Sequence, residues 1–356
     1  MSKILALDLG KFKTETGGLD TDTGEIRFQR IASNRHYMSR LLKKEQPDVV
    51  VFEACTMAGW VFDLCQELGI PAKVANTSGE AWKFKNLKRK TDRDDAERLA
   101  RLESMGELPT VYVPAVAVRE RRSLIEYRES LIEHRVKLKN QIRSLYLAQG
   151  LELPRGHAAW TVEGLKKLQE MAQPLLECTA TELWRGQLHA ILQELRELYQ
   201  RIDTVEKRLD ALGEADPATR LLQSADGIGS RTAEVVAVYL ENPRRFKNGR
   251  AVSAYSGLVP RQYQSGELDR RGRITRRGPR LLRKMLVEAA WCMLRYNEWA
   301  RQVVARISGG QRARKKQAVV ALARKLLVRL WAMLRDGVPW NDQPPRAIGQ
   351  PAIALV

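Results

Sequence analysis

Two stretches decide the fold of the first third of this chain: ILALDLG at residues 4–10 and DVVVFEA at residues 48–54. Both predict strands, and the continuous β-branched run of the second predicts burial on both faces of a sheet. Further strands are predicted at residues 25–31 and 71–76, with helices between them. Gly17 and Gly18 predict the hairpin turn after the first strand. This order indicates an α/β domain with a mixed sheet, which we expect to cover residues 1–112.

The middle of the chain, residues 113–215, is predicted to form long helices at 117–149 and from about Thr181 to Leu212. The second helix carries apolar residues at alternating steps of three and four, the a/d pattern of a coiled coil. These residues are Leu188, Ile191, Leu195, Leu198, Ile202, Val205, Leu209 and Leu212. The pattern fits an antiparallel helix pair within the chain as well as an intermolecular coiled coil, and the sequence leaves both open.

The last part of the chain changes character again. Residues 216–341 combine predicted helices with a basic, Gly-rich segment, and we expect a mostly α-helical C-terminal domain there. Residues 342–356 contain PP and GQP and are expected to form a flexible tail.

Composition narrows the class of partner. The chain has 61 Lys and Arg against 42 Asp and Glu, a net charge of +19, which attracts phosphate backbones. No stretch approaches the roughly 20 apolar residues that span a bilayer, and no secretory signal is present, so we expect a cytoplasmic protein and no membrane partner. The four cysteines lack CxxC spacing and the four histidines do not pair, so any metal would need oxygen ligands, which favours Mg²⁺ or Mn²⁺.

Four acidic residues stand out by position: Asp8 in the first strand, Glu53 ending the VVVFE strand, and Asp92 and Asp95 in a predicted helix. Side chains at the carboxyl ends of neighbouring strands converge, and a spacing of three puts two residues on one helix face. Clustered carboxylates repel one another unless a cation lies between them. Two divalent ions can align the attacking and leaving oxygens of a phosphodiester, so the set predicts metal-dependent chemistry on nucleic acid. By itself, Asp92 could simply cap its helix.

These acids, with KTDRDDA at residues 90–96, resemble the DEDD transposases of the insertion-sequence-110 family. The second half resembles the same family through GIG at 227–229, RF at 245–246, GLVP at 257–260, Ser265-Gly266 and GPRLLR at 278–283. Position 279 is Pro where the family pattern leads us to expect Asn. The resemblance implies an RNase H-like, RuvC-like nuclease domain, a coiled-coil region and a transposase domain.

The resemblance also implies roles for individual residues and partners. Ser265 would be the nucleophile of a serine-linked DNA recombination, and metal ions would bind Asp8, Glu53, Asp92 and Asp95. In a dimer or tetramer, the serine of one subunit would face the acids of another. The partners would be donor and target double-stranded DNA and a non-coding guide (bridge) RNA, with the protein associated with the nucleoid when it acts. Ser256 is the main alternative serine, and the sequence around Ser265 alone is that of an ordinary turn.

Basic clusters predict where nucleic acid binds, because guanidinium groups match phosphate oxygens. The first has eight cations and no acid between its ends: Arg270, Arg271, Arg273, Arg276, Arg277, Arg280, Arg283 and Lys284. The second interleaves cations with Trp82 and Phe84, which suits stacking on a strand, and comprises Lys83, Lys85, Lys88 and Arg89. GIGSRTA at 227–233 fits either a phosphate-binding turn or a tight turn before a buried helix.

Three other classes of function stay open at this point. A RuvC-like junction-resolving nuclease that uses water would need the four acids but not Ser265. A sugar-kinase-like ATPase would share the N-terminal DLG but needs a second phosphate-binding strand-turn, and residues 200–356 contain no convincing one. A non-catalytic nucleic-acid scaffold would leave Asp8 and Glu53 without a role.

Overall fold

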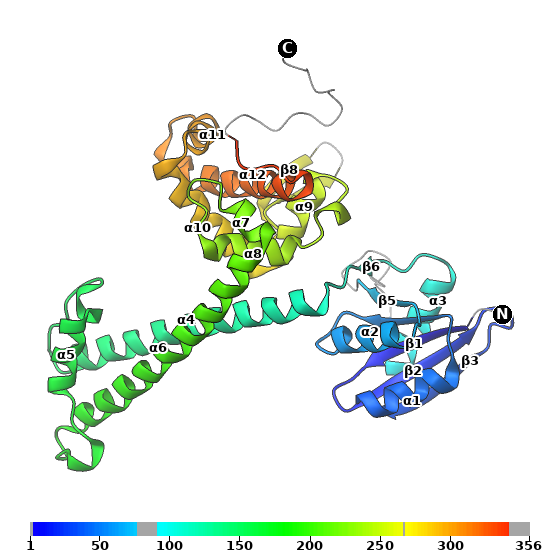
Figure 1. The fold of residues 1–356 in the computed structure, drawn as a ribbon, viewed down its shortest axis with the longest axis horizontal. Helices are drawn as coiled ribbons and strands as arrows, with labels where there is room; N and C mark the ends of the chain where they lie inside the picture. The colour runs from blue at the N-terminus through cyan, green and yellow to red at the C-terminus, as the bar shows by residue number, and fades with distance from the viewer. Residues whose placement is uncertain (1–2, 77–90, 266–267, 342–356) are drawn as a thin grey trace. The chain divides into compact units, whose positions relative to one another are not determined.

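The computed structural model of this chain describes residues 3–76, 91–265 and 268–341. They form two compact units, an N-terminal unit of residues 1–117 and a C-terminal unit of residues 118–356 (Figure 1). The expected tail at 342–356 lies outside the described residues, as does the predicted basic cluster Lys83, Lys85, Lys88 and Arg89.

The N-terminal unit is built on a six-stranded sheet in the order β3-β2-β1-β4-β5-β6. β1 (Lys3–Leu9), β2 (Lys13–Asp20) and β3 (Ile26–Ala32) are antiparallel neighbours. β4 (Val49–Glu53) and β5 (Ala72–Ala75) run parallel to β1, and β6 (Thr110–Val111) is antiparallel to β5. The predicted α/β unit with a mixed sheet is therefore confirmed.

Helices cover both faces of this sheet. α1 (Arg35–Glu45) and α2 (Ala58–Glu67) share one apolar core with Leu5, Leu7, Val50, Phe52 and Val74. α3 (Asp92–Ser104) shares the core of the opposite face with Ile4, Ala6, Leu19, Val51 and Ala75. Alternate residues of β1 and β4 thus point to opposite faces, as strand geometry requires.

The predicted hairpin turn at Gly17 and Gly18 is wrong. Both glycines lie inside β2, and the chain turns instead between Leu9 and Lys13. A Cβ on Gly17 would stand 3.6 Å from the Cβ of Ala96 in α3 and 3.5 Å from the Phe28 ring. Gly17 therefore lies inside a strand that packs against α3, a placement that a single sequence does not separate from a turn.

Two long helices, α4 (Val116–Ala148) and α6 (Leu183–Ala215), extend from the body of the C-terminal unit. They are antiparallel, because Tyr146 and Trp184 have ring centroids 6.2 Å apart at one end while Arg121 and Asp216 form an ion pair of 2.7 Å at the other. α5 (Val162–Met171) lies between their far ends, with the short helices η2 (Ala158–Trp160) and η3 (Leu175–Glu177) (Figure 1).

The predicted apolar stripe of α6 lies in a core that it shares with α4. Ile191 and Leu212 are only half-buried, and Leu192 is buried beside them. The chain itself thus supplies an antiparallel partner for this stripe. The supercoil of a coiled coil and the intermolecular pairing stay predictions.

The body of the C-terminal unit is mostly helical, which confirms that part of the predicted fold. Its helices are α7 (Pro217–Leu222), α8 (Ser230–Leu240), η4 (Pro243–Arg245), α9 (Gly249–Ser256), α10 (Arg280–Tyr296), α11 (Glu298–Ser308), η5 (Arg312–Arg314) and α12 (Lys315–Asp336). Strands β7 (Pro260–Ser265) and β8 (Leu268–Ile274) form the one sheet in the described part of this unit, a two-stranded hairpin. Across the described ranges, no helix is long and apolar enough to cross a membrane.

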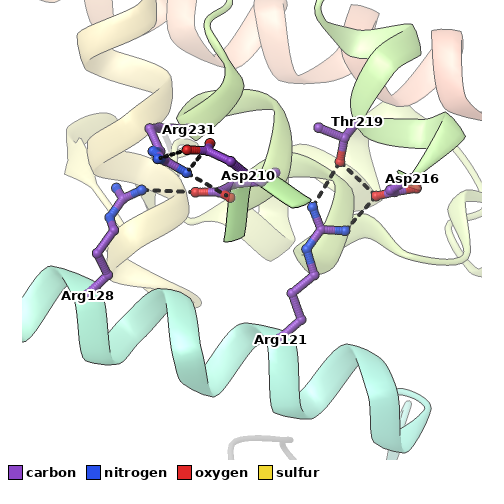
Figure 2. A network of polar contacts seen from close by, with 7 residues as sticks. Arg121, Arg128, Asp210, Asp216, Thr219 and Arg231 are labelled. Atoms are coloured by element: carbon purple, nitrogen blue, oxygen red, sulfur yellow. Dashed lines mark hydrogen bonds and ion pairs between the residues drawn. The ribbon is translucent and has the colours of Figure 1, made fainter. Parts of the chain in front are cut away.

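A buried polar network ties α4 to this body (Figure 2). Arg128 Nη1 of α4 lies 3.0 Å from Glu234 Oε1 of α8. Arg121, two turns earlier on α4, bonds Asp216 Oδ2 at 2.7 Å and Thr219 Oγ1 at 3.1 Å. Because each contact joins charged or polar groups with directional geometry, the network fixes the register of α4 against α7 and α8.

Candidate active site

Asp8 and Glu53 occupy matching positions on adjacent strands. β1 and β4 are parallel, with Leu7 opposite Phe52, so Asp8 and Glu53 are the next residues on each strand. Leu7 and Phe52 point into the core with α1 and α2. Since successive side chains alternate between faces, both carboxylates lie on the other face, the one that α3 covers. Each is partly exposed at the carboxyl edge of the sheet.

The capping of α3 does not depend on Asp92. Thr91 Oγ1 accepts a hydrogen bond from Asp94 N at 3.3 Å, and the Asp94 carboxylate accepts one from Thr91 N at 3.1 Å. This capping box satisfies the donors of the first turn. Asp92 is the first residue of the helix and is exposed, so it is available for another role.

Asp95 lies on the side of α3 that faces the sheet. It is buried, as are Ala96 and Leu99 on the same helix face. Arg98 Nη1 lies 3.6 Å from Asp95 Oδ1. A carboxylate in the first turn is also favoured by the positive end of the helix dipole.

Glu15 is an acidic residue of this region that the sequence analysis did not single out. It lies directly opposite Asp8 in the β1–β2 register, so the two side chains share a face. Glu15 is 3% exposed, and its two oxygens bond Arg30 Nε at 2.7 Å and Arg93 Nε at 3.2 Å. Arg93 belongs to the first turn of α3, so this contact brings that turn to the edge that bears Asp8.

The signal for Glu15 was present in the sequence but hidden by the wrong turn. With the hairpin placed at Gly17 and Gly18, Glu15 has no defined partner. With the turn placed between Leu9 and Lys13, the alternation of β2 puts Glu15 across from Asp8. A pocket of about 480 Å³ lies beside it, lined by Glu15, Phe28, Gln29, Arg30, Thr91, Asp92 and Arg93.

The donor chemistry of this edge suits a hard divalent cation. Asp8, Glu53, Asp92 and Asp95 offer carboxylate oxygens only, which Mg²⁺ and Mn²⁺ prefer. Within residues 3–76, 91–265 and 268–341, however, no three His, Cys, Asp or Glu side chains are close enough together to hold a metal ion. The backbone places Asp8 and Glu53 on one face and at one edge, and the acidic side chains would have to move closer together to hold an ion.

Ser265 ends β7 in the C-terminal unit. In the hairpin register its backbone pairs with Leu268, and Gln264 pairs with Asp269. The serine therefore lies at the tip of a two-stranded hairpin, next to residues 266 and 267, which lie outside the described residues.

Two glycines set the base of this hairpin. Gly257 has φ +69°, and a Cβ there would lie 1.9 Å from the carbonyl oxygen of Arg277. Gly278 has φ +90°, and a Cβ there would lie 1.9 Å from the carbonyl oxygen of Tyr255. The GLVP and GPR segments therefore pack backbone to backbone, which excludes side chains at both positions.

Pro279 and Ser256 also have structural explanations. Pro279 occupies the N-cap position of α10 and makes no side-chain capping bond, whereas the Asn expected from the family pattern could accept one. Ser256 is fully buried, and its Oγ donates to Ser253 O at 2.8 Å and accepts from Leu258 N at 3.3 Å. These bonds give Ser256 a role in packing.

The basic cluster at 270–284 divides into two groups. Arg270, Arg273, Arg276 and Arg277 are exposed, and the side chain of Arg271 lies outside the described part. The three cations in the first turns of α10 already have protein partners: Arg280 lies 3.3 Å from Glu133, Lys284 pairs with Glu129, and Arg283 donates to three backbone carbonyls. Burial, together with nearby Arg276, lowers the pKa of Arg283. The predicted all-basic surface is thus partly neutralised by α4.

In the GIG turn at 227–229, the first glycine, Gly227, is required by close packing against Met293. Gly227 has φ +89°, and a Cβ there would lie 2.9 Å from Met293 Cγ. The helix that follows is buried from Thr232 to Leu240. A tight turn before a buried helix accounts for Gly227. Around Gly229, by contrast, no atom lies within 4 Å of a Cβ position, so this residue is not required by packing.

Two family models match this chain. A model for the transposases of the IS116/IS110/IS902 family matches residues 219–305, and a model for DEDD transposases of the IS110 type matches residues 5–149.

Full-length relatives are also similar. The transposase for insertion sequence element IS1111A of Coxiella burnetii is 28% identical over 343 residues, covering 93% of this chain and 89% of the relative. The y4pF/y4sB protein of Sinorhizobium fredii is 30% identical over 348 residues, covering 96% and 87%. Among solved structures, RuvC of T. thermophilus in complex with a Holliday junction substrate covers 31% of this chain and 100% of its own, at 11% identity and a TM-score of 0.24.

Proposed function

Because this chain belongs to the IS110 family of insertion-sequence transposases, we propose that it cleaves and rejoins DNA with Ser265 as nucleophile and with divalent metal ions held by Asp8, Glu53, Asp92 and Asp95. The observation that carries this proposal is the placement of Asp8 and Glu53 at one edge and on one face of the sheet, beneath the first turn of α3. Carboxylates brought together at this edge would repel one another, and a bound divalent cation would offset that repulsion.

The carboxylates have distinct tasks in this proposal. Asp8 and Glu53, fixed on rigid strands, define the position of the cation, while Asp92 and Asp95 approach from α3. Glu15 holds Arg93 and so positions the first turn of the helix. A bound divalent ion supplies Lewis acidity toward a phosphodiester oxygen.

Ser265 supplies the covalent step. Its Oγ attacks the scissile phosphorus, an Oγ–P bond forms and the bond from phosphorus to one deoxyribose oxygen breaks. The departing deoxyribose oxygen takes up a proton, which balances the proton lost by the serine hydroxyl. Because the phosphoserine is itself a phosphodiester, the energy of the broken bond is kept for the rejoining step and no ATP is needed.

The partners follow from charge and from the family. The net charge of +19 suits several nucleic-acid strands at once. Four exposed arginines lie in β8 of the hairpin that bears Ser265 or directly after it: Arg270, Arg273, Arg276 and Arg277. We propose donor and target duplexes as substrates, a non-coding guide RNA that selects them by base pairing, and a dimer or tetramer of the protein. Sequencing the RNA that copurifies with the protein from its host tests the guide; a particle without RNA that still recombines DNA would refute it.

Trapping a covalent protein–DNA adduct tests the chemistry. Labelled DNA containing the element's end is incubated with the protein and Mg²⁺, denatured and analysed for label that migrates with protein. We expect an adduct that Ser265→Ala abolishes and that Ser130→Ala retains, since Ser130 is an exposed serine of the same unit. Cleavage by Ser265→Ala without an adduct would instead assign the chain to the nucleases that use water.

A further inference from the structure

The C-terminal unit also contains a cavity next to the start of β7, the first strand of the hairpin that bears Ser265. This cavity has a volume of about 930 Å³ and is lined by residues of α9, α11 and α12 and by Val259. Its apolar side chains are Val259, Trp299, Val303 and Val328. This volume is in the range that takes a small organic group.

One side of the cavity is formed where α9 packs closely against α12. Gly249, the first residue of α9, lies against α12, and a Cβ there would stand 2.9 Å from Val328 Cγ1. The backbone of Gly249 does not have positive φ, so packing alone accounts for the glycine. α9 and α12 therefore pack closely at this side of the cavity.

The cavity carries a concentrated positive charge. Five cationic side chains line it, and none of the described lining residues is acidic: Arg250, Arg306, Arg324, Lys325 and Arg329. Arg329 is only 7% exposed, and its guanidinium lies over the rings of Trp299 (4.4 Å) and Trp340 (4.2 Å). Arg329 Nη2 donates a hydrogen bond to Asn341 O at 2.6 Å. This bond holds the guanidinium in place against the Trp299 ring.

Apolar and cationic side chains together in one cavity favour a ligand that is itself partly apolar and partly anionic. A bare anion would leave the apolar side chains that line the cavity in contact with water. An apolar ligand would leave the five cationic side chains without a counter-charge. A nucleotide satisfies both, because its base is a flat, largely apolar ring and its phosphates are anionic. We propose that this cavity binds one unpaired nucleotide of a nucleic-acid strand, with its base against Trp299 and Val303 and its flanking phosphates against Arg306 and Arg324. The proposal rests on the proposed function only in taking nucleic acid as the partner.

Photo-crosslinking locates the nucleotide. The full-length Ser265→Ala protein is mixed with a duplex that carries 5-iodouracil in a single-nucleotide bulge, or with a duplex in which the same base is paired. We expect the bulged duplex to crosslink within α11, at Trp299 or a neighbour, and the paired duplex not to. Equal crosslinking of both duplexes, or crosslinks that map only outside the cavity, would overturn the proposal.

A charge-matched pair of variants separates this site from general attraction. Arg306→Gln with Arg324→Gln removes two charges from the cavity, and Lys166→Gln with Lys167→Gln removes two from α5. We expect the first double variant to weaken binding of the bulged duplex about tenfold and to reduce its salt slope by about 1 to 2, with the paired duplex little changed. Equal losses from both double variants would refute the site.

The source of the nucleotide is tested by competition. A hundredfold excess of thymidine monophosphate is expected to leave the crosslink in place, because a free nucleotide lacks the neighbouring phosphates. Loss of the crosslink at equimolar mononucleotide would assign the cavity to free nucleotides and overturn the strand-bound form. None of these readouts requires cleavage, so their failure is distinct from failure to form the adduct at Ser265.

Discussion

Arg128 and Glu234 form an ion pair inside the C-terminal unit, with Arg128 Nη1 3.0 Å from Glu234 Oε1 and side-chain exposures of 5% and 2% (Figure 2). Burial raises the pKa of the Glu234 carboxyl, while Arg128 and Arg231 oppose that change. Taking both charges out of water is costly, and their attraction offsets this only while both are present. The pair therefore specifies how α4 docks on α8.

Removing one charge of this pair should cost more than removing both. Arg128→Met leaves Glu234 buried with weaker compensation, and we expect the free energy of unfolding to fall by about 3 kcal/mol. The double variant Arg128→Met with Glu234→Met should recover most of this loss, because both charges of the pair are gone and Arg231 keeps its ion pair with Asp210. Urea unfolding followed by tryptophan fluorescence measures both. A double variant as unstable as the sum of the two single variants would contradict this account.

Asp216 should make stability depend on pH. Burial alone would raise its pKa, but hydrogen bonds from Thr219, Arg121 and Ala218 N outweigh it and hold the pKa below the ordinary value of 3.8. A carboxyl of this kind stabilises the fold above its unfolded-state pKa, and the stabilisation is lost as the pH falls through the lower folded-state value.

We therefore expect Asp216→Asn to lower the free energy of unfolding by about 2 kcal/mol at pH 7, with a difference from the unsubstituted protein that shrinks below pH 3.8. Thermal unfolding at a series of pH values measures this difference. The exposed Asp203→Asn on α6 is the control. A difference for Asp216→Asn that stayed constant down to pH 2 would refute the linkage.

Substituting alanine for glycine should destabilise the protein where the glycine is closely packed and have little effect where the space around it is open. Gly257→Ala puts a Cβ 1.9 Å from the Arg277 carbonyl oxygen in a left-handed conformation, and we expect a loss of about 4 kcal/mol or failure to fold. Gly229→Ala has no atom within 4 Å of the new Cβ and should change stability by less than about 1 kcal/mol. Melting temperatures of the purified variants decide the matter, and similar effects at the two positions would be inconsistent with this packing.

Glu15 should act on the metal-dependent reaction through Arg93. Glu15→Gln keeps the shape of the side chain but loses the charge that holds Arg30 and Arg93, so we expect the apparent affinity for Mg²⁺ to weaken roughly tenfold. Asp8→Asn should abolish adduct formation at any Mg²⁺ concentration. Glu25→Gln, an exposed acid after β2, is the matched control. A Mg²⁺ titration of adduct formation that Glu15→Gln leaves unchanged would remove its positioning role.

Mixed oligomers test where the serine acts. Asp8→Asn lacks a carboxylate of the proposed metal site and Ser265→Ala lacks the proposed nucleophile, so each should be inactive alone. If the serine of one subunit works with the carboxylates of another, co-expressing the two variants with different tags should restore adduct formation, carried by the Asp8→Asn subunit. Inactivity of the purified mixed oligomer would place the serine and the acids in the same subunit.

Several features of this protein follow from local pattern. The strands at ILALDLG and DVVVFEA, the two long helices and the acids at Asp8 and Glu53 were all predictable, because each depends on hydrophobic periodicity or on a charge inside an apolar strand. The family motifs point to Ser265 as a nucleophile, which stays a prediction, because its local sequence alone is only that of a turn.

What the tertiary structure decided concerns residues that meet across long stretches of chain. Gly17 looked like a turn because its neighbour Ala96 lies almost eighty residues away, and with that turn misplaced, Glu15 lost its partner Asp8. The neutralisation of Lys284 by Glu129 likewise joins residues 155 positions apart. Sequence determines which way a local segment prefers to fold, because that depends on near neighbours. Which charges are left for a ligand depends on packing between distant segments, and only the folded chain decides it.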